Sequence, residues 1–170
     1  RLERLPLDSR VRGAVELLVA RGGWGSAPEG VYQGVAVHES FSSVVAEQVE
    51  VVMENGAPVV RRVVCAVDCG VVINPDIVRM QLESAVLFAL SAALHGEITI
   101  RDGAVVQGNF DDYPLVRIDA CPEVEVHFVV TERAPTGIGE PGVPPLAPAL
   151  ANAIFAATGK RLRELPLRLS

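Results

Sequence analysis

The architecture of this chain follows from residues 44–69, VVAEQVEVVMENGAPVVRRVVCAVDC. Two valine-rich runs flank Asn55-Gly56, the dipeptide that most strongly favours a tight β-hairpin turn. Because valine is almost continuous in both runs, we expect two antiparallel strands that are covered on at least one face. An upstream run at 31–38, VYQGVAVH, predicts a third strand beside them.

The segments on either side predict helices and further strands. Capping residues, glycine stops and apolar periodicity predict helices, and alternating apolar residues predict strands. Helices are expected at 9–20 (capped by Asp8 or Ser9 and stopped by Gly22-Gly23), at 76–94 (capped by Asp76) and at 145–158; a second hairpin around Asp102-Gly103; and strands at 123–130 and 162–169.

This order predicts an α+β fold, with a mixed or antiparallel sheet and two or three packed helices. A chain of 170 residues with 49% hydrophobic residues is large enough to bury a core. No stretch has the composition of a linker, so we expect residues 1–170 to form a single domain. Residues 1–30 would be a helix and loop that lead into it.

Composition argues against two classes of partner. The net charge is −6 and the basic residues are scattered, so no basic stripe indicates nucleic-acid binding. The most apolar run, residues 85–94, has about half of the ~20 residues that cross a bilayer, which predicts a buried helix and no membrane span. Because the chain begins at Arg1 without methionine, it is expected to be processed or cut from a longer polypeptide.

Cysteines and histidines lack the spacing of metal ligands. There is no Cys-x-x-Cys pair and no His-Glu-x-x-His segment, so a protein-ligated metal has no support. We interpret the cysteines as buried thiols rather than metal or iron–sulfur ligands, and the histidines as structural. These residues are Cys65, Cys69, Cys121, His38, His95 and His127.

A stiff loop presents one carboxylate near the end of the chain. Residues 136–148 read TGIGEPGVPPLAP and run into the last predicted helix. Glycines permit close backbone approach and prolines restrict the chain, so Glu140 is a candidate positioned base. The alternative is that Glu140 only interacts with the N-terminus of that helix. Local sequence leaves both interpretations open.

The same loop contains Gly137-x-Gly139-x-x-Gly142, the spacing of the dinucleotide-binding fingerprint. That fingerprint needs a strand directly before it and free N–H groups at a helix start. Here Glu140 would repel a pyrophosphate, and the prolines remove donors. We therefore disfavour a dinucleotide-binding oxidoreductase.

The long helix predicted at 76–94 carries a second polar candidate, Gln81. An amide facing a buried site can both donate to and accept from a polar cofactor. With a period of 3.6 residues, Gln81 shares a face with Ala85, Phe88 and Ala92, which predicts that it is buried. The alternative is that Gln81 and Glu83 lie on the wet side of the helix.

Taken together, these segments resemble the molybdenum-binding subunit of the xanthine oxidase/aldehyde oxidase family, closest to the C-terminal part of the isoquinoline 1-oxidoreductase β-subunit branch. Five segments match in family order and cover nearly the whole chain. They are GVAVHESFSSVVAEQVEV (34–51), VVCAVDCGVVINPDIVRMQLE (63–83), LSAALHGEITIRDG (90–103), NFDDYPLVRIDACPEVEVH (109–127) and GIGEPGVPPLAPALANAIFAATGKRLRELPL (137–167).

The resemblance implies roles for three residues. Glu140 matches the family's general base, which takes a proton from a metal-bound hydroxyl as that hydroxyl attacks an electron-poor carbon and hydride leaves. Gln81 matches a glutamine that lies against the pterin–molybdenum cofactor. Gly139 would allow close backbone approach to it. The family usually has glycine after the motif glutamate, whereas this chain has Ser84 and Ala85.

The resemblance also implies what the complete enzyme uses. Its cofactor would be molybdopterin, in the cytosine dinucleotide form, with molybdenum. Its partners would be upstream molybdopterin-binding segments, a [2Fe–2S] iron–sulfur subunit or domain, and a small-molecule substrate, an N-heterocycle or aldehyde hydroxylated with water. A bacterial location in cytoplasm or periplasm stays open.

Family subunits are several times longer than this chain, so we expect the isolated 170 residues to fold but to hold no cofactor and to be inactive. The alternative is a non-catalytic binding or assembly module with a vestigial site.

Overall fold

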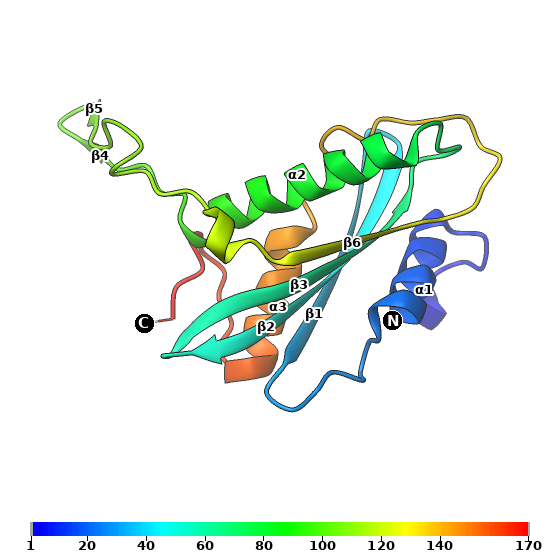
Figure 1. The fold of residues 1–170 in the computed structure, drawn as a ribbon, viewed down its shortest axis with the longest axis horizontal. Helices are drawn as coiled ribbons and strands as arrows, with labels where there is room; N and C mark the ends of the chain where they lie inside the picture. The colour runs from blue at the N-terminus through cyan, green and yellow to red at the C-terminus, as the bar shows by residue number, and fades with distance from the viewer. Residues whose placement is uncertain (1, 170) are drawn as a thin grey trace.

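The computed structural model describes residues 2–169 and has the α+β fold that the sequence predicts (Figure 1). Its main sheet has the strand order β1-β2-β3-β6, and a separate two-stranded hairpin pairs β4 with β5. The elements in chain order are η1 (Leu2–Arg4), α1 (Arg10–Gly22), β1 (Tyr32–Ser40), β2 (Ser43–Glu54), β3 (Ala57–Asp68), α2 (Pro75–Leu94), β4 (Ile100–Arg101), β5 (Ala104–Val105), η2 (Ile118–Ala120), β6 (Glu123–Phe128) and α3 (Leu146–Thr158).

Two tight turns build the antiparallel part of the sheet. β1 pairs with β2 through the turn Phe41-Ser42, and β2 pairs with β3 through Asn55-Gly56. All four turn residues have positive φ, as a two-residue hairpin turn of the primed type requires. β6 then adds parallel to β3, so the sheet is mixed.

Helices cover both faces of this sheet. α2 and α3 pack on one face around a core that includes Val45, Val49 and Leu82. α1 packs on the opposite face over Val44 and Ala46. The two sets of valines and alanines alternate along β2, because successive side chains in a strand point to opposite faces. Figure 1 shows α1 (blue) on the far side of the sheet from α3 (orange).

α3 lies close against the edge strand β1 because of one glycine. A Cβ on Gly34 would lie 2.1 Å from the carbonyl oxygen of Ala149 and 2.2 Å from the amide nitrogen of Ala153. Only glycine can therefore occupy this position without moving the helix. The contact sets how closely α3 packs against β1.

α2 begins one residue earlier than predicted, and its cap is a different residue. The side chain of Asn74 accepts hydrogen bonds from the backbone N–H groups of Asp76 and Ile77, so Asn74 and not Asp76 is the N-cap. By length and composition alone α2 could cross a membrane. A core helix passes the same test, and α2 buries seven residues in the body of the molecule.

Two predicted strand regions differ from the structure. The hairpin around Asp102-Gly103 forms, but its strands have two residues each and project away from the sheet (Figure 1). The strand predicted at 162–169 is wrong, since no strand occurs there within the described residues. That tail instead packs Leu167 into the core, where its N–H donates to the carbonyl oxygen of Ala93 at 2.7 Å.

Candidate functional site

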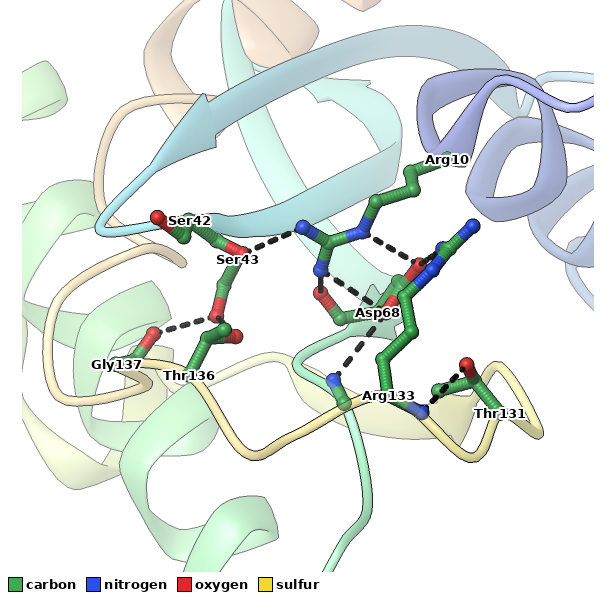
Figure 2. A network of polar contacts seen from close by, with 9 residues as sticks. Arg10, Ser42, Ser43, Asp68, Thr131, Arg133, Thr136 and Gly137 are labelled. Carbon is green, nitrogen blue, oxygen red and sulfur yellow. Dashed lines mark hydrogen bonds and ion pairs between the residues drawn. The ribbon is translucent and has the colours of Figure 1, made fainter.

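The loop that carries Glu140, residues 129–145 (the Glu140 loop), is fastened to the ends of two strands. Thr136 N–H donates to the carbonyl oxygen of Cys69 at 2.9 Å, just beyond β3. Gly137 N–H donates to the carbonyl oxygen of Phe41 at 3.2 Å, and the Ser43 hydroxyl donates to the carbonyl oxygen of Gly137 at 2.6 Å. Figure 2 shows Ser43 reaching the loop from the start of β2.

A buried carboxylate holds the start of the Glu140 loop. Arg10 of α1 donates to both carboxylate oxygens of Asp68, at 2.9 and 3.0 Å, and to the Ser42 carbonyl oxygen at 2.6 Å (Figure 2). Arg133 of the loop adds a bond of 3.2 Å, and Gly70 N–H adds another of 3.2 Å. The bond from Arg10 is the main cause that lowers the pKa of Asp68, against the effect of burial.

The strand end and the loop also touch through their backbones. Gly70 has φ +76°, and a Cβ there would lie 2.1 Å from the carbonyl oxygen of Ala134. Beside this contact, Val71 N–H donates to the carbonyl oxygen of Arg133 at 2.9 Å. A glycine with left-handed backbone is needed at this position to bring the loop so close. The beginning of the loop is therefore held by α1, the β1-β2 turn and the end of β3 together.

Glu140 itself is exposed. Its backbone carbonyl accepts from Val143 N–H at 2.9 Å, which closes a turn just before α3. Within residues 2–169 its carboxylate makes no hydrogen bond or ion pair, and α3 has no side-chain cap. Within residues 2–169, Glu140 therefore makes no capping hydrogen bond to α3. The carboxylate stands free on a loop whose backbone is fixed at both ends.

The turn after Glu140 rests on the helix that carries Gln81. A Cβ on Gly142 would lie 2.9 Å from Leu82 Cδ2 and 3.0 Å from Ala85 Cβ, so the loop and α2 are in close contact. Gly139 is different, since nothing lies within 4 Å of the position its Cβ would take. No neighbour among the described residues requires glycine at 139.

The prediction that Gln81 is buried is wrong. Gln81 is exposed, and the face that it was expected to share is divided: Ala85 is buried at 4%, whereas Phe88 is 70% exposed. α2 turns Leu82 and Ala85 toward the sheet and Gly142, and as a result Gln81 faces outward. Ser84, at the position where the resemblance leads us to expect glycine, is also exposed.

Sequence reasoning missed a second buried carboxyl, Glu47 of β2. Its side chain has no exposed area, and Oε2 has no hydrogen-bond partner among residues 2–169. The Cys65 thiol donates weakly to Oε1 at 3.7 Å, and a Cβ on Gly142 would lie 3.7 Å from the same oxygen. Burial raises the pKa of Glu47 well above its usual value, and the thiol opposes this only in part. The sequence did contain a signal for this burial. Glu47 lies two residues from both Val45 and Val49, so it shares their face of the strand.

The structure tests the predictions made for the cysteines and for the dinucleotide-like glycine pattern. Cys65 and Cys69 are buried thiols, as predicted, whereas Cys121 is exposed, contrary to prediction. In residues 2–169 no group of His, Cys, Asp and Glu is arranged to hold a metal ion. β6 ends at Phe128, well before Gly137, and α3 begins only at Leu146. This lacks the direct strand-to-helix turn of a dinucleotide site.

Comparison with known proteins identifies the family of this chain. A family model described as a molybdopterin cofactor-binding domain matches residues 16–122. The chain belongs to this family. The matched range includes Gln81 and ends before Gly139 and Glu140.

Relatives of this molybdopterin cofactor-binding domain are oxidoreductases. Isoquinoline 1-oxidoreductase subunit beta of Brevundimonas diminuta is 41% identical over 109 residues, which are 64% of this chain and 14% of the relative. A membrane-bound aldehyde dehydrogenase (pyrroloquinoline-quinone) of Gluconacetobacter polyoxogenes is 38% identical over 121 residues, covering 71% and 16%. The aldehyde oxidoreductase structure from Desulfovibrio desulfuricans matches with a TM-score of 0.63 at 26% identity, covering 73% and 14%.

These comparisons confirm the resemblance to the isoquinoline 1-oxidoreductase β-subunit branch. They also show that the chain spans only 14–16% of the length of those three relatives. The exposed groups fit a polar cofactor that approaches from outside. Gln81 presents a solvent-facing amide, and Gly139 leaves open space beside the loop backbone.

Proposed function

We propose that the complete polypeptide carrying residues 1–170 is a molybdenum hydroxylase. It would hydroxylate a carbon of an N-heterocycle or an aldehyde, with water as the source of oxygen and Glu140 as the general base. The observation that carries this proposal is the Glu140 loop, whose backbone is fixed to β3 and the β1-β2 turn while its carboxylate is unpaired and exposed. A base needs both features, because it must be held in place and still be free to accept a proton.

Each candidate residue has a distinct task in this proposal. A carboxylate oxygen of Glu140 accepts the proton that leaves the attacking oxygen. The amide of Gln81 and the backbone at Gly139 would hold the pterin. Molybdopterin, in its cytosine dinucleotide form, would supply the redox chemistry of the molybdenum when bound. The contact of Gly142 with Leu82 and Ala85 supports a shared site, since it joins the loop of the base to the helix of the amide.

The fixed loop explains why one carboxylate can be effective. Misplacing a catalytic group by about 1 Å can cost on the order of 100-fold in rate. Hydrogen bonds at Thr136 and Gly137 lie immediately upstream of Glu140, and the turn to Val143 lies immediately downstream. The substitution Glu140→Gln keeps the shape and removes the base, so it tests the role without disturbing the loop.

The test uses the complete polypeptide with its iron–sulfur partner. Glu140→Gln is expected to lower the turnover number by about 10²–10⁴-fold, with molybdenum content unchanged. Glu132→Gln is the matched control, because Glu132 is an exposed carboxylate in the same loop. It should leave the turnover number near that of the unmodified enzyme. Near-normal turnover of Glu140→Gln with molybdenum bound would remove the assignment.

The remaining requirements of the complete enzyme are part of the same proposal. Upstream segments would complete the molybdopterin site, and a [2Fe–2S] subunit or domain would remove the electrons. The isolated 170 residues would then be folded, free of cofactor and inactive. Turnover of an aldehyde or N-heterocycle by residues 1–170 alone would contradict this.

A non-catalytic binding or assembly module is the second candidate. Ser84 favours it, because its exposed side chain stands on α2 three residues after Gln81, where the family usually has glycine. Those added atoms could crowd the cofactor. Metal analysis of the purified complete polypeptide separates the two functions: stoichiometric molybdenum supports the enzyme, and its absence supports the module.

A further inference from the structure

The edge strand β1 has a groove along its free side. The groove has a volume of about 970 Å³ and is walled by α1 and the N-terminal segment on one side and by α3 on the other. Its apolar wall residues on α1 include Val15 and Val19, and on α3 they include Phe155. Both helices therefore extend past the last strand of the sheet, so the groove has a strand edge as its floor and a helix on each side.

The backbone of β1 presents unused hydrogen-bonding groups to this groove. In an antiparallel pair, residues alternate between those that bond the partner strand and those that face away. The carbonyl of Val35 accepts from the side chain of Asn152 of α3 at 3.0 Å, so Val35 belongs to the set that faces away from β2. Gln33, Val37 and Glu39 are in phase with it. Within residues 2–169 the backbone groups of Val37, which lines the groove, and of Glu39, just beyond its lining, have no partner on that side.

The side chains around the groove match the two faces of a further strand. Val35 and Val37 point to the α1 face, because Val35 packs with the α1 cluster. On that side Val19 is 40% exposed, Trp24 is 46% exposed and Val37 is 37% exposed. On the other face, Arg161 lies 3.5 Å from the centroid of the Phe155 ring. An extended segment placed here would bury apolar side chains on both of its faces, as interior strands do.

We propose that β1 is an interior strand in the complete polypeptide, and that a strand from outside residues 1–170 of the same polypeptide pairs with its free edge. The relatives named above are about six to seven times longer than the matched segment, so most of such a polypeptide lies outside this chain. Addition of a strand to an open sheet edge satisfies the backbone groups and fills the flanking apolar pockets at once. The added strand carries apolar residues at consecutive positions.

A second copy of this chain is a poorer occupant. In a symmetric dimer the same edge would meet the same edge. α1 and α3 both overhang that edge, so the helices of the two copies would meet before the strands could pair. A single strand without helices at its sides can enter the groove. This proposal does not depend on the role of Glu140.

Hydrogen exchange in the complete polypeptide, resolved to single amides, tests the pairing. The amides of Ala36 and His38 face β2 and are protected in either case, so they are the internal control. If a further strand is present, the amides of Val37 and Glu39 should exchange within about tenfold of that control. Exchange of both amides at the rate of unstructured amides would overturn the proposal, because an open edge leaves them in contact with solvent.

A photo-crosslinking residue in place of Val37 identifies the occupant. The expected product is an intramolecular crosslink to a peptide outside residues 1–170, with a yield that does not depend on protein concentration. A crosslink between two copies, or one only to residues within 1–170, would contradict the proposed occupant. The exchange and crosslinking results together separate a paired edge from the identity of the strand that pairs with it.

Discussion

Two carboxyl groups are buried in the same sheet, and their surroundings are opposite. Asp68, at the end of β3, lies on the face of the sheet that α1 covers, and two arginines and a backbone N–H donate hydrogen bonds to it. Glu47, in the middle of β2, lies on the face of α2 and α3 with one thiol as its only partner among residues 2–169. The pKa of Asp68 is lowered, which favours its ionised form, and the pKa of Glu47 is raised, which favours its protonated form.

This difference shows which face of the sheet uses charge to join elements. Asp68 joins α1 and the Glu140 loop to the end of β3, three segments that are far apart in sequence. Glu47 joins nothing by charge. It fills space in a core whose other side chains are apolar, directly below the contact between Gly142 and α2. Removing the two carboxyls should therefore have effects of opposite sign.

Asp68→Ala should cause the larger loss of stability. The substitution leaves the Arg10 guanidinium without its main partner. We expect the free energy of unfolding to fall by about 3 kcal/mol at pH 7. This is the lower end of the range for breaking a buried ion pair, because Arg10 reaches solvent. The measurement is urea unfolding of the 170-residue chain. Because the folded pKa of Asp68 lies below its unfolded value, this stabilisation is present above about pH 4 and is lost as the pH falls through the folded pKa.

Asp76→Ala is the matched control for that experiment. Asp76 also pairs with an arginine, Arg79 at 2.9 Å, but its side chain is 88% exposed. An exposed pair of this kind contributes about 0–1 kcal/mol. Equal losses from the two substitutions would show that burial of Asp68 adds nothing to its ion pairs.

Glu47→Leu should stabilise the chain, by about 1–2 kcal/mol at pH 8, since it replaces a buried carboxyl whose partner is one weakly donating thiol with an apolar group of similar size. The folded pKa of Glu47 lies above its unfolded value, so its contribution is full below about pH 4.5 and is lost as the pH rises toward the folded pKa. The gain from the substitution should therefore grow with pH in this range. Urea unfolding at several pH values measures it.

Glu47→Gln provides the control, because it keeps the shape and removes the titration. It should flatten the pH dependence as Glu47→Leu does. If both variants retain the pH dependence of the unmodified chain, Glu47 is not the group that binds the proton. If Glu47→Leu is destabilising at pH 8, the carboxyl has a partner that the present contacts do not include.

The contrast also explains what could be predicted from sequence. Local signals predicted the hairpin at Asn55-Gly56 and the strands around it, and a first helix that starts after Asp8 or Ser9 and stops at Gly22-Gly23, because backbone conformation and valine content act over a few residues. The structure selects Ser9 and Gly23 as the caps of α1. The strand expected at 162–169 did not form, because strand pairing depends on where the tertiary fold carries a segment, which local sequence does not give. That segment turns into the core through Leu167 instead.

The candidate site was predictable only in part. The stiff Glu140 loop was visible in its glycines and prolines, but its anchors were not, because Ser43 and Asp68 lie 94 and 65 residues away in sequence from the loop residues that they bond. Gln81 was placed on a buried face by its helical period. Helical periodicity shows which residues share a face, but it does not show which face is buried. In the structure the face of α2 that meets the loop at Gly142 is the one with Leu82 and Ala85.

The smallest expected effect separates the two arginines of Asp68. Arg10→Lys should lower the free energy of unfolding by about 1 kcal/mol, since one ammonium group cannot replace the planar fork that bonds both carboxylate oxygens. Arg133→Lys should cost less than about 0.5 kcal/mol, because Arg133 is 53% exposed and makes a single bond of 3.2 Å to Asp68. Urea unfolding of both variants at pH 7 measures the difference. If Arg133→Lys costs as much as Arg10→Lys, the loop supports the buried carboxylate as strongly as α1 does.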